Sequence, residues 1–245
     1  MSTPDPWAAL RRTTQARIGL GRAGNSLPTR RVLEFATAHA AARDAVHEPL
    51  DVEAVSAQVA ELGLGEPVVL TSRAETRGDY LRRPDLGRQP ASLEPLAGCE
   101  QGADVALVLA DGLSSRAVAD HGAALLGALA KALDGRRIAP PVLATQARVA
   151  LGDHVGEALG ARFVVVVIGE RPGLSVADSL GVYLTMHPRP GRADSERNCI
   201  SNVHPPDGLT YESAARVAAA LVVGADELGR SGVDLKDRSG TELAG

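Results

Sequence analysis

The sequence predicts an α/β protein built on a doubly wound, mostly parallel sheet, with an N-terminal helical extension. Residues 163–168 form an unbroken β-branched run, which is typical of a strand buried on both faces of a parallel sheet. From residue 104 onward, strand-like and helix-like segments alternate regularly, as in sheets covered by helices on both faces. The first 65 residues show only helical periodicity.

The helical extension is assigned to residues 1–65. Helices are expected over residues 6–20, 30–46 and 51–62, with Thr29 and Asp51 as side-chain caps of the second and third. Within this region, His39 and His47 lie eight residues apart. Two helical turns are too many for a shared metal ion, so both histidines are interpreted as solvated or hydrogen-bonded.

The main domain is assigned to residues 66–237 and is expected to be Rossmann-like, followed by a tail over residues 238–245. Residues 71–90 are rich in Arg, Asp, Gly and Pro and are expected to form a long loop. Ser114 is expected to cap the helix that follows the second strand. Strands are expected over residues 67–70, 104–109, 141–145, 163–168 and 182–186, and helical segments over 115–133, 153–159, 176–180 and 210–228.

Composition restricts the classes of partner. The formal charge of −4 gives no electrostatic reason to expect nucleic acid or an anionic membrane surface. The apolar runs have strand length, so neither a secretion signal nor a membrane span is expected, and the predicted location is the cytoplasm. Cys99 and Cys199 lie far apart, which favours neither a disulfide framework nor a zinc site.

One motif suggests nucleotide binding but lacks its structural context. Gly19, Gly21 and Gly24 spell G-x-G-x-x-G, with Asp44 twenty residues beyond the last glycine. The dinucleotide fingerprint needs a buried strand before its first glycine, whereas here an arginine-rich helical pattern precedes it and Pro28 follows. A stand-alone nucleotide-binding oxidoreductase is therefore kept only as an alternative.

Polar residues follow three of the predicted strands, where open α/β sheets place their ligands. They are Asp111 and Gly112, then Gln146 and Arg148, then Glu170 and Arg171, and they are expected to converge on one edge of the sheet. Glu170 and Arg171 could equally pair with one another or cap a neighbouring helix. The chain carries neither the G-x-S-x-G nor the H-E-x-x-H motif, so no catalytic residue and no metal ligand is assigned.

A second polar cluster follows the last predicted strand. Arg197, Asn198, Cys199, Ser201 and Asn202 are residue types that rarely suit a core. A single cysteine is most often a small buried apolar residue, but these neighbours favour a contact role without making Cys199 a nucleophile.

Several strings in this chain resemble one family. ARIGLGRAGNSLPTR, HAAARDAVHEPLD, ADVALVLADGLS, VIGERPGLSVADSLGVYLT and RNCISN occur in this order. Together they resemble the small subunit of adenosylcobalamin-dependent ethanolamine ammonia-lyase over about residues 7–237. The resemblance implies a hetero-oligomer with a large subunit that holds ethanolamine, and a radical reaction that yields acetaldehyde and ammonia. The small subunit would cover the corrin face that bears the dimethylbenzimidazole base.

The same resemblance implies a cofactor site in the domain spanning residues 66–237. It places cobalamin contacts at Val149, Glu170 and Cys199. Some cobalamin proteins insert a histidine beneath cobalt from a D-x-H-x-x-G motif, but His121 and His154 directly follow an aspartate and do not match it. The cofactor is therefore expected to be base-on adenosylcobalamin. A non-catalytic corrinoid-binding protein is a further alternative, and the few residues before Trp7 leave packaging in a bacterial microcompartment in doubt.

Overall fold

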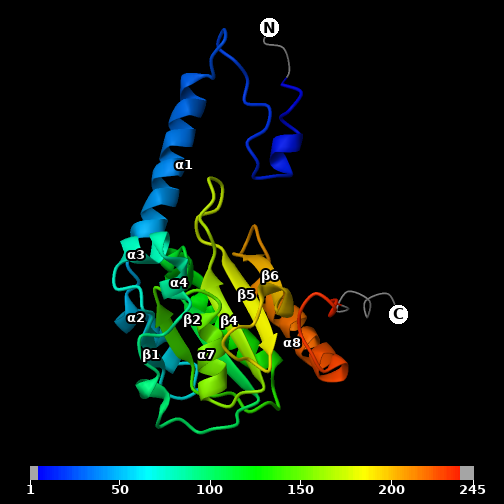
Figure 1. The fold of residues 1–245 in the computed structure, drawn as a ribbon. Helices are drawn as coiled ribbons and strands as arrows, with labels where there is room; N and C mark the ends of the chain where they lie inside the picture. Colours follow the sequence, from blue (N-terminus) through cyan, green and yellow to red (C-terminus); the bar gives the residue numbers. More distant parts are fainter. Residues whose placement is uncertain (1–4, 238–245) are drawn as a thin grey trace, which may run out of the picture.

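The fold is built on one six-stranded sheet with helices on both faces (Figure 1). The structure is a computed structural model and describes residues 5–237. The strand order is β1-β3-β2-β4-β5-β6, so β2 and β4 lie at the centre. The strands are β1 (Val68–Thr71), β2 (Val105–Ala110), β3 (Val142–Thr145), β4 (Phe163–Gly169), β5 (Leu180–Met186) and β6 (Asn198–Val203).

The sheet is mixed rather than uniformly parallel. β1, β3, β2 and β4 run parallel, whereas β5 pairs antiparallel with β4 and β6 pairs antiparallel with β5. The α/β class is thus confirmed, and the last two strands depart from a parallel doubly wound sheet. Antiparallel neighbours need no crossover helix. Residues 170–179 accordingly join β4 to β5 without one, and the helical turn expected at residues 176–180 is absent from this described segment.

One side of the sheet, here called the closed face, is covered by α2 (Val52–Ala60), α6 (Ala123–Ala132) and α8 (Tyr211–Leu228). Alternate strand residues such as Leu107, Leu109 and Val165 are fully buried against these helices. Asp51 caps α2 by accepting a hydrogen bond from the Ala54 N–H at 3.0 Å, as expected. Side chains fully buried in this way each stabilise the fold by about 1.5–3 kcal/mol.

The opposite side, here called the open face, is covered unevenly. α7 (Leu151–Ala158) packs against β2 and β4, where Val108, Val164 and Val166 are buried. Beyond α7, the register places Tyr183 of β5 beside Val166 and Cys199 of β6 beside Tyr183. Cys199 and its neighbour Ser201 are exposed, so this face is left uncovered over the outer strands.

A buried ion pair fixes the edge of the open face. Arg197, just before β6, donates two hydrogen bonds of 2.7 Å to the carboxylate of Asp153 in α7. It also donates to the Thr185 hydroxyl at 2.9 Å. The two charged side chains are 2% and 1% exposed.

The expected long loop over residues 71–90 is wrong in part, because it contains the short helices α3 (Arg77–Arg82) and α4 (Pro84–Gly87).

The N-terminal region projects from the sheet as an arm, here defined as residues 5–47 (Figure 1). Its helix α1 (Thr29–His47) was expected, although Pro28 rather than Thr29 occupies the N-cap position. The expected helix over residues 6–20 is wrong: only a 3-10 turn, η1 (Leu10–Arg12), forms. Arg11 donates a 2.5 Å hydrogen bond to the Gly19 carbonyl and folds this segment back on itself.

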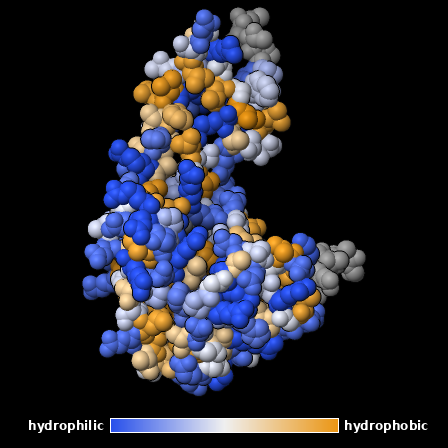
Figure 2. Space-filling view, viewed as in Figure 1, coloured by the Kyte–Doolittle hydropathy of each residue, from blue (hydrophilic) through white to orange (hydrophobic). Residues whose placement is uncertain are grey.

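The arm carries apolar side chains that the rest of the chain leaves exposed. Figure 2 shows these apolar residues on its surface, with the body of the molecule set apart below. They are Trp7, Leu10, Leu27, Val32, Leu33 and Phe35. Among residues 5–237, no helix is long and apolar enough to cross a bilayer.

Candidate functional site

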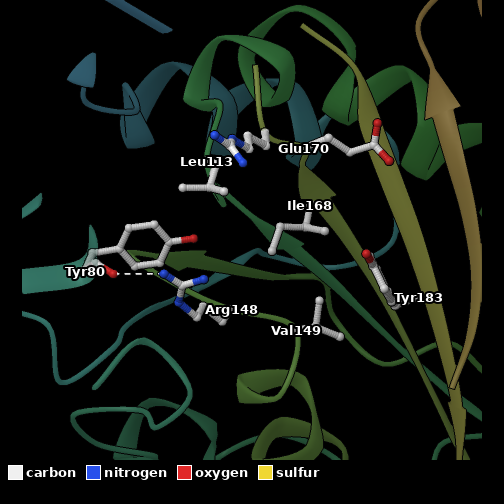
Figure 3. Close-up of a pocket in the computed structure, with 9 residues that line it drawn as sticks. Tyr80, Leu113, Arg148, Val149, Ile168, Glu170 and Tyr183 are labelled. Carbon is white, nitrogen blue, oxygen red and sulfur yellow. Dashed lines mark hydrogen bonds between the residues drawn. The ribbon is translucent and has the colours of Figure 1, made fainter. Parts of the chain in front are cut away.

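A cavity of about 440 Å³ opens where the parallel strands β2, β3 and β4 end (Figure 3). This is the edge at which open α/β sheets bind ligands. The lining comes from α3, from the end of β4, from the loops after these three strands, and from β5. The residues are Tyr80, Leu113, Arg148, Val149, Ile168, Gly169, Glu170, Arg171 and Tyr183.

Two glycines allow the strand ends to approach one another closely. A Cβ atom added at Gly169 would overlap the Ser114 carbonyl oxygen, and one added at Gly112 would overlap the Gly169 carbonyl oxygen. Gly112 also has φ +56°, which side chains other than glycine adopt reluctantly. Ser114 caps the helix that begins at Ser115, as expected, by accepting from the Ala117 N–H at 3.2 Å.

Glu170 is held in place at the rim of the cavity. Its carboxylate accepts a 2.7 Å hydrogen bond from the Ser179 hydroxyl and a 3.2 Å bond from the Asn202 backbone N–H. A carboxylate offers about four acceptor sites, so this arrangement leaves capacity for further donors. The alternative in which Glu170 pairs with Arg171 or caps a helix does not hold in this geometry.

Tyr183 and Cys199 lie side by side on the open face. They are paired across β5 and β6, and the sulfur of Cys199 is 3.3 Å from the Ser201 hydroxyl oxygen. Burial, and then the hydrogen bond with Cys199, raise the pKa of Tyr183 well above its ordinary value. The phenol is therefore neutral near pH 7. In Figure 3 its hydroxyl is directed toward the side of the cavity where Glu170 lies.

Tyr80 forms the other wall of the cavity and is 1% exposed. The Arg77 and Arg148 guanidiniums lie over its ring at 4.7 and 4.6 Å from the centroid. Its hydroxyl donates to the Ala147 carbonyl at 3.2 Å. Burial is the main cause that raises the pKa of Tyr80 to about 12, and the nearby Asp111 charge adds to it.

The three residues assigned from the family resemblance lie in one region of the molecule. Val149 and Glu170 line the cavity. Cys199 lies next to it, opposite the lining residue Tyr183. The convergence of the three strand-end loops is confirmed, because Arg148 shares the cavity and Asp111 accepts from the Gln146 N–H at 2.8 Å.

The polar cluster after β5 divides into separate roles. Arg197 is buried against Asp153. Asn198 binds the backbone of Gly232 and Leu235 through its amide. Cys199 and Ser201 remain exposed. Tyr80 and Tyr183 are lining residues that sequence reasoning missed. Tyr183 is an aromatic residue with a polar hydroxyl in the middle of the apolar strand β5, and this was the signal that could have found it.

The glycine motif near the N-terminus has a structural role. None of the described residues before Gly19 forms a strand, so the context of the dinucleotide fingerprint is missing. Instead a Cβ atom at Gly19 would overlap the Trp7 side chain. His121 bonds the Tyr211 hydroxyl at 2.7 Å, and His154 lines a different cavity. No group of three acidic, His or Cys residues within 5–237 is arranged to hold a metal ion.

These features define an α/β protein with a cavity at the carboxyl edge of its sheet and an open sheet face beside it. The model of the ethanolamine ammonia-lyase light chain family matches residues 4–236. The chain belongs to this family.

Curated relatives agree with the family match. The ethanolamine ammonia-lyase small subunit of Rhodococcus erythropolis is 64% identical over 236 residues, which cover 96% of this chain and 91% of the relative. The corresponding subunit of Ralstonia nicotianae is 51% identical over 249 residues, covering 98% and 92%. That of Rhodopseudomonas palustris is 52% identical over 240 residues, covering 96% and 91%.

Proposed function

We propose that this chain, together with a large subunit, binds adenosylcobalamin and takes part in the conversion of ethanolamine to acetaldehyde and ammonia. The observation that carries the proposal is the joint placement of Val149 and Glu170 in one cavity, with Cys199 on the open face beside it. Family membership supports the reaction class, and this placement supports the surface that we propose for corrinoid binding.

The residues present fit a corrinoid. A cavity of about 440 Å³ suits a drug-sized ligand, and a corrinoid is larger. The exposed part of the open face, over β5 and β6, extends the available surface beyond the cavity. Glu170 presents acceptor sites at its rim, and the corrin periphery carries amide donors. Among the lining residues, Arg148 has a buried Nε without a hydrogen-bond partner.

The chain's own contribution is to bind and orient the cofactor. When bound, adenosylcobalamin supplies a 5′-deoxyadenosyl radical by homolysis of its cobalt–carbon bond. Glu170 would accept hydrogen bonds from corrin amides, because Ser179 and Asn202 already hold its carboxylate in one orientation. Val149 and Tyr183 would contribute apolar contact, and the neutral phenol of Tyr183 avoids burying a charge.

We assign the arm to the contact with the large subunit. Its exposed apolar residues include Leu33 at 63% and Leu10 at 50% exposure. Clustered apolar side chains of this kind mark protein–protein interfaces. The arm is also continuous with the cavity rim, since Ser175 donates a 3.0 Å hydrogen bond to the Gln15 carbonyl. A subunit that covers the cavity would therefore meet the arm as well.

The proposal is tested by acetaldehyde release from ethanolamine in the presence of adenosylcobalamin. Three samples are compared: this chain alone, a family large subunit alone, and the two co-expressed. Activity confined to the co-expressed pair supports the proposal. If the two chains neither co-purify nor release acetaldehyde together, the proposed function is wrong.

The role of Glu170 is tested in the assembled complex. Glu170→Ala is expected to weaken cobalamin binding about tenfold or more, the worth of one or two hydrogen bonds to a charged group. The circular dichroism spectrum should be unchanged. Glu61→Ala removes an exposed carboxylate from the end of α2 and serves as the matched control. Equal affinities for the two variants would remove Glu170 from the site.

A further inference from the structure

The loop after β3 places an arginine in the cavity without a carboxylate partner. Arg148 donates from Nη2 to the Tyr80 carbonyl at 3.0 Å, and its guanidinium lies over the Tyr80 ring. Its Nε is buried with no hydrogen-bond partner, and its other N–H groups contact no acceptor within residues 5–237. Figure 3 shows this guanidinium between Tyr80 and Val149.

Arg77, which also lies over the Tyr80 ring, has a different charge environment. It lies 3.6 Å from the Asp111 carboxylate and donates to the Val46 and Gln146 oxygen atoms. Both arginines stack on Tyr80, but only one of the two has a nearby counter-charge. Stacking alone therefore does not account for the positive charge that Arg148 brings into the cavity.

The cavity as a whole carries excess positive charge. Its ionised lining residues are Arg148, Arg171 and Glu170, which give a net charge of +1. Arg171 is exposed and forms no ion pair among the described residues. Glu170 is engaged by Ser179 and Asn202 rather than by either arginine. Two arginines without carboxylate partners in one cavity favour an anionic ligand group, for which the guanidinium fork is well suited.

We propose that Arg148, assisted by Arg171, binds the phosphodiester in the nucleotide tail of cobalamin. This inference rests on the proposed function, since it assumes that a corrinoid occupies the site. The side chains around the corrin are neutral amides, so the phosphodiester is the anionic group that the cofactor can offer. A cavity of about 440 Å³ holds a part of the cofactor of about the size of this tail, with the corrin lying over the open face.

The test measures the affinity of the assembled complex for three corrinoids. Cyanocobalamin has both the phosphodiester and the base, cobinamide phosphate has a phosphate without the base, and cobinamide has neither. Arg148→Met is expected to weaken binding of the first two about 10- to 100-fold, the worth of charge-assisted hydrogen bonds, and to change cobinamide binding less than about twofold. Arg148→Lys should restore part of the loss because it keeps the charge.

Arg88→Met is the matched control, because Arg88 is an exposed arginine that lines a different cavity. It should leave all three affinities unchanged. A similar loss for all three corrinoids in Arg148→Met would show that Arg148 only holds the Tyr80 wall in place, and no loss would also overturn the proposal. If the wild-type complex binds none of the corrinoids, the proposed function itself fails.

Discussion

The two faces of the sheet are built from the same strands but are covered to different extents. On the closed face, α2, α6 and α8 bury residues such as Leu109, Leu129 and Val165 completely. On the open face, α7 covers the centre and leaves Cys199 exposed. The comparison shows that the two faces differ in burial: the closed face holds the larger part of the core, and the open face leaves the surface on which we propose that a ligand binds.

The largest effect is expected where the open face is anchored. Asp153→Ala would remove the buried carboxylate that pairs with Arg197 and leave this guanidinium only the exposed Asp194 carboxylate, 3.5 Å from its Nε. Breaking a buried pair in this way costs about 3–5 kcal/mol in the free energy of unfolding, measured by urea denaturation. The double variant Asp153→Leu with Arg197→Met removes both charges and should cost less than the single variant. A single variant as stable as wild type would show that this pair does not secure the open face.

A smaller but still large loss is expected on the closed face. Leu129→Ala removes a fully buried side chain of α6 and should lower the free energy of unfolding by about 2–5 kcal/mol. The same truncation at the exposed Leu33 of the arm should change stability by less than about 0.5 kcal/mol. Cobalamin affinity of the folded Leu129→Ala complex should match wild type. A specific loss of affinity would contradict the division between the two faces.

The pH at which the tyrosines ionise measures how deeply they are buried. The chain has three tyrosines, and the pKa of each is raised by burial, with Tyr80 at about 12. The unfolded value is 10.0, so the stability from neutral Tyr80 is fully present below pH 10 and is lost as pH rises toward about 12. At most it amounts to about 2–3 kcal/mol.

Tyrosinate absorbance provides the measurement. At pH 10 the folded chain should show little absorbance, whereas the chain unfolded in denaturant should be about half ionised. Tyr80→Phe should lose stability less steeply than wild type between pH 10 and about 12. Superimposable titration curves for the folded and unfolded chains would mean that the tyrosines are not buried as described.

The smallest change in stability is expected at the uncovered edge. Cys199→Ala alters an exposed side chain and should change the free energy of unfolding by less than about 0.5 kcal/mol. Its effect should appear instead in cobalamin affinity, because Cys199 adjoins Tyr183 at the proposed site. Ser92→Ala, an exposed polar residue away from the cavity, is the control for affinity. A large stability loss with unchanged affinity would reverse the assignment of Cys199.

Much of the closed face could be predicted from the sequence, because uninterrupted β-branched runs and helical periodicity both reflect burial. The run at residues 163–168 is buried in β4 as expected. The open face was harder to predict. In β6 the adjacent residues Ser201 and Asn202 are both exposed, so the strand does not alternate regularly between apolar and polar residues and its hydrophobic pattern does not identify it as a strand. The direction of β5 depends on a loop without a helix, which periodicity does not detect.

The cavity shows the same limit at the level of single residues. Glu170 and Arg148 follow predicted strands, so their convergence could be expected from topology alone. Tyr80 reaches the cavity from α3, within a segment expected to be a loop, and sequence spacing gives no sign of this long-range contact. The arm illustrates the opposite error. Helical spacing over residues 6–20 predicts a helix, but the hydrogen bond from Arg11 to the Gly19 carbonyl folds this segment back on itself.

The contact between the arm and the loop after β4 has a thermodynamic consequence. Arg17 donates a 2.8 Å hydrogen bond to the Leu174 carbonyl, and Ser175 donates to the Gln15 carbonyl, a few residues from Glu170. A partner that orders the arm thereby orders the rim of the cavity, and a ligand that fixes the rim also fixes the arm. Reciprocity then requires that each binding event strengthen the other by the same factor. Under the proposed function, recruitment of the large subunit and binding of the cofactor would thus form one cooperative assembly step.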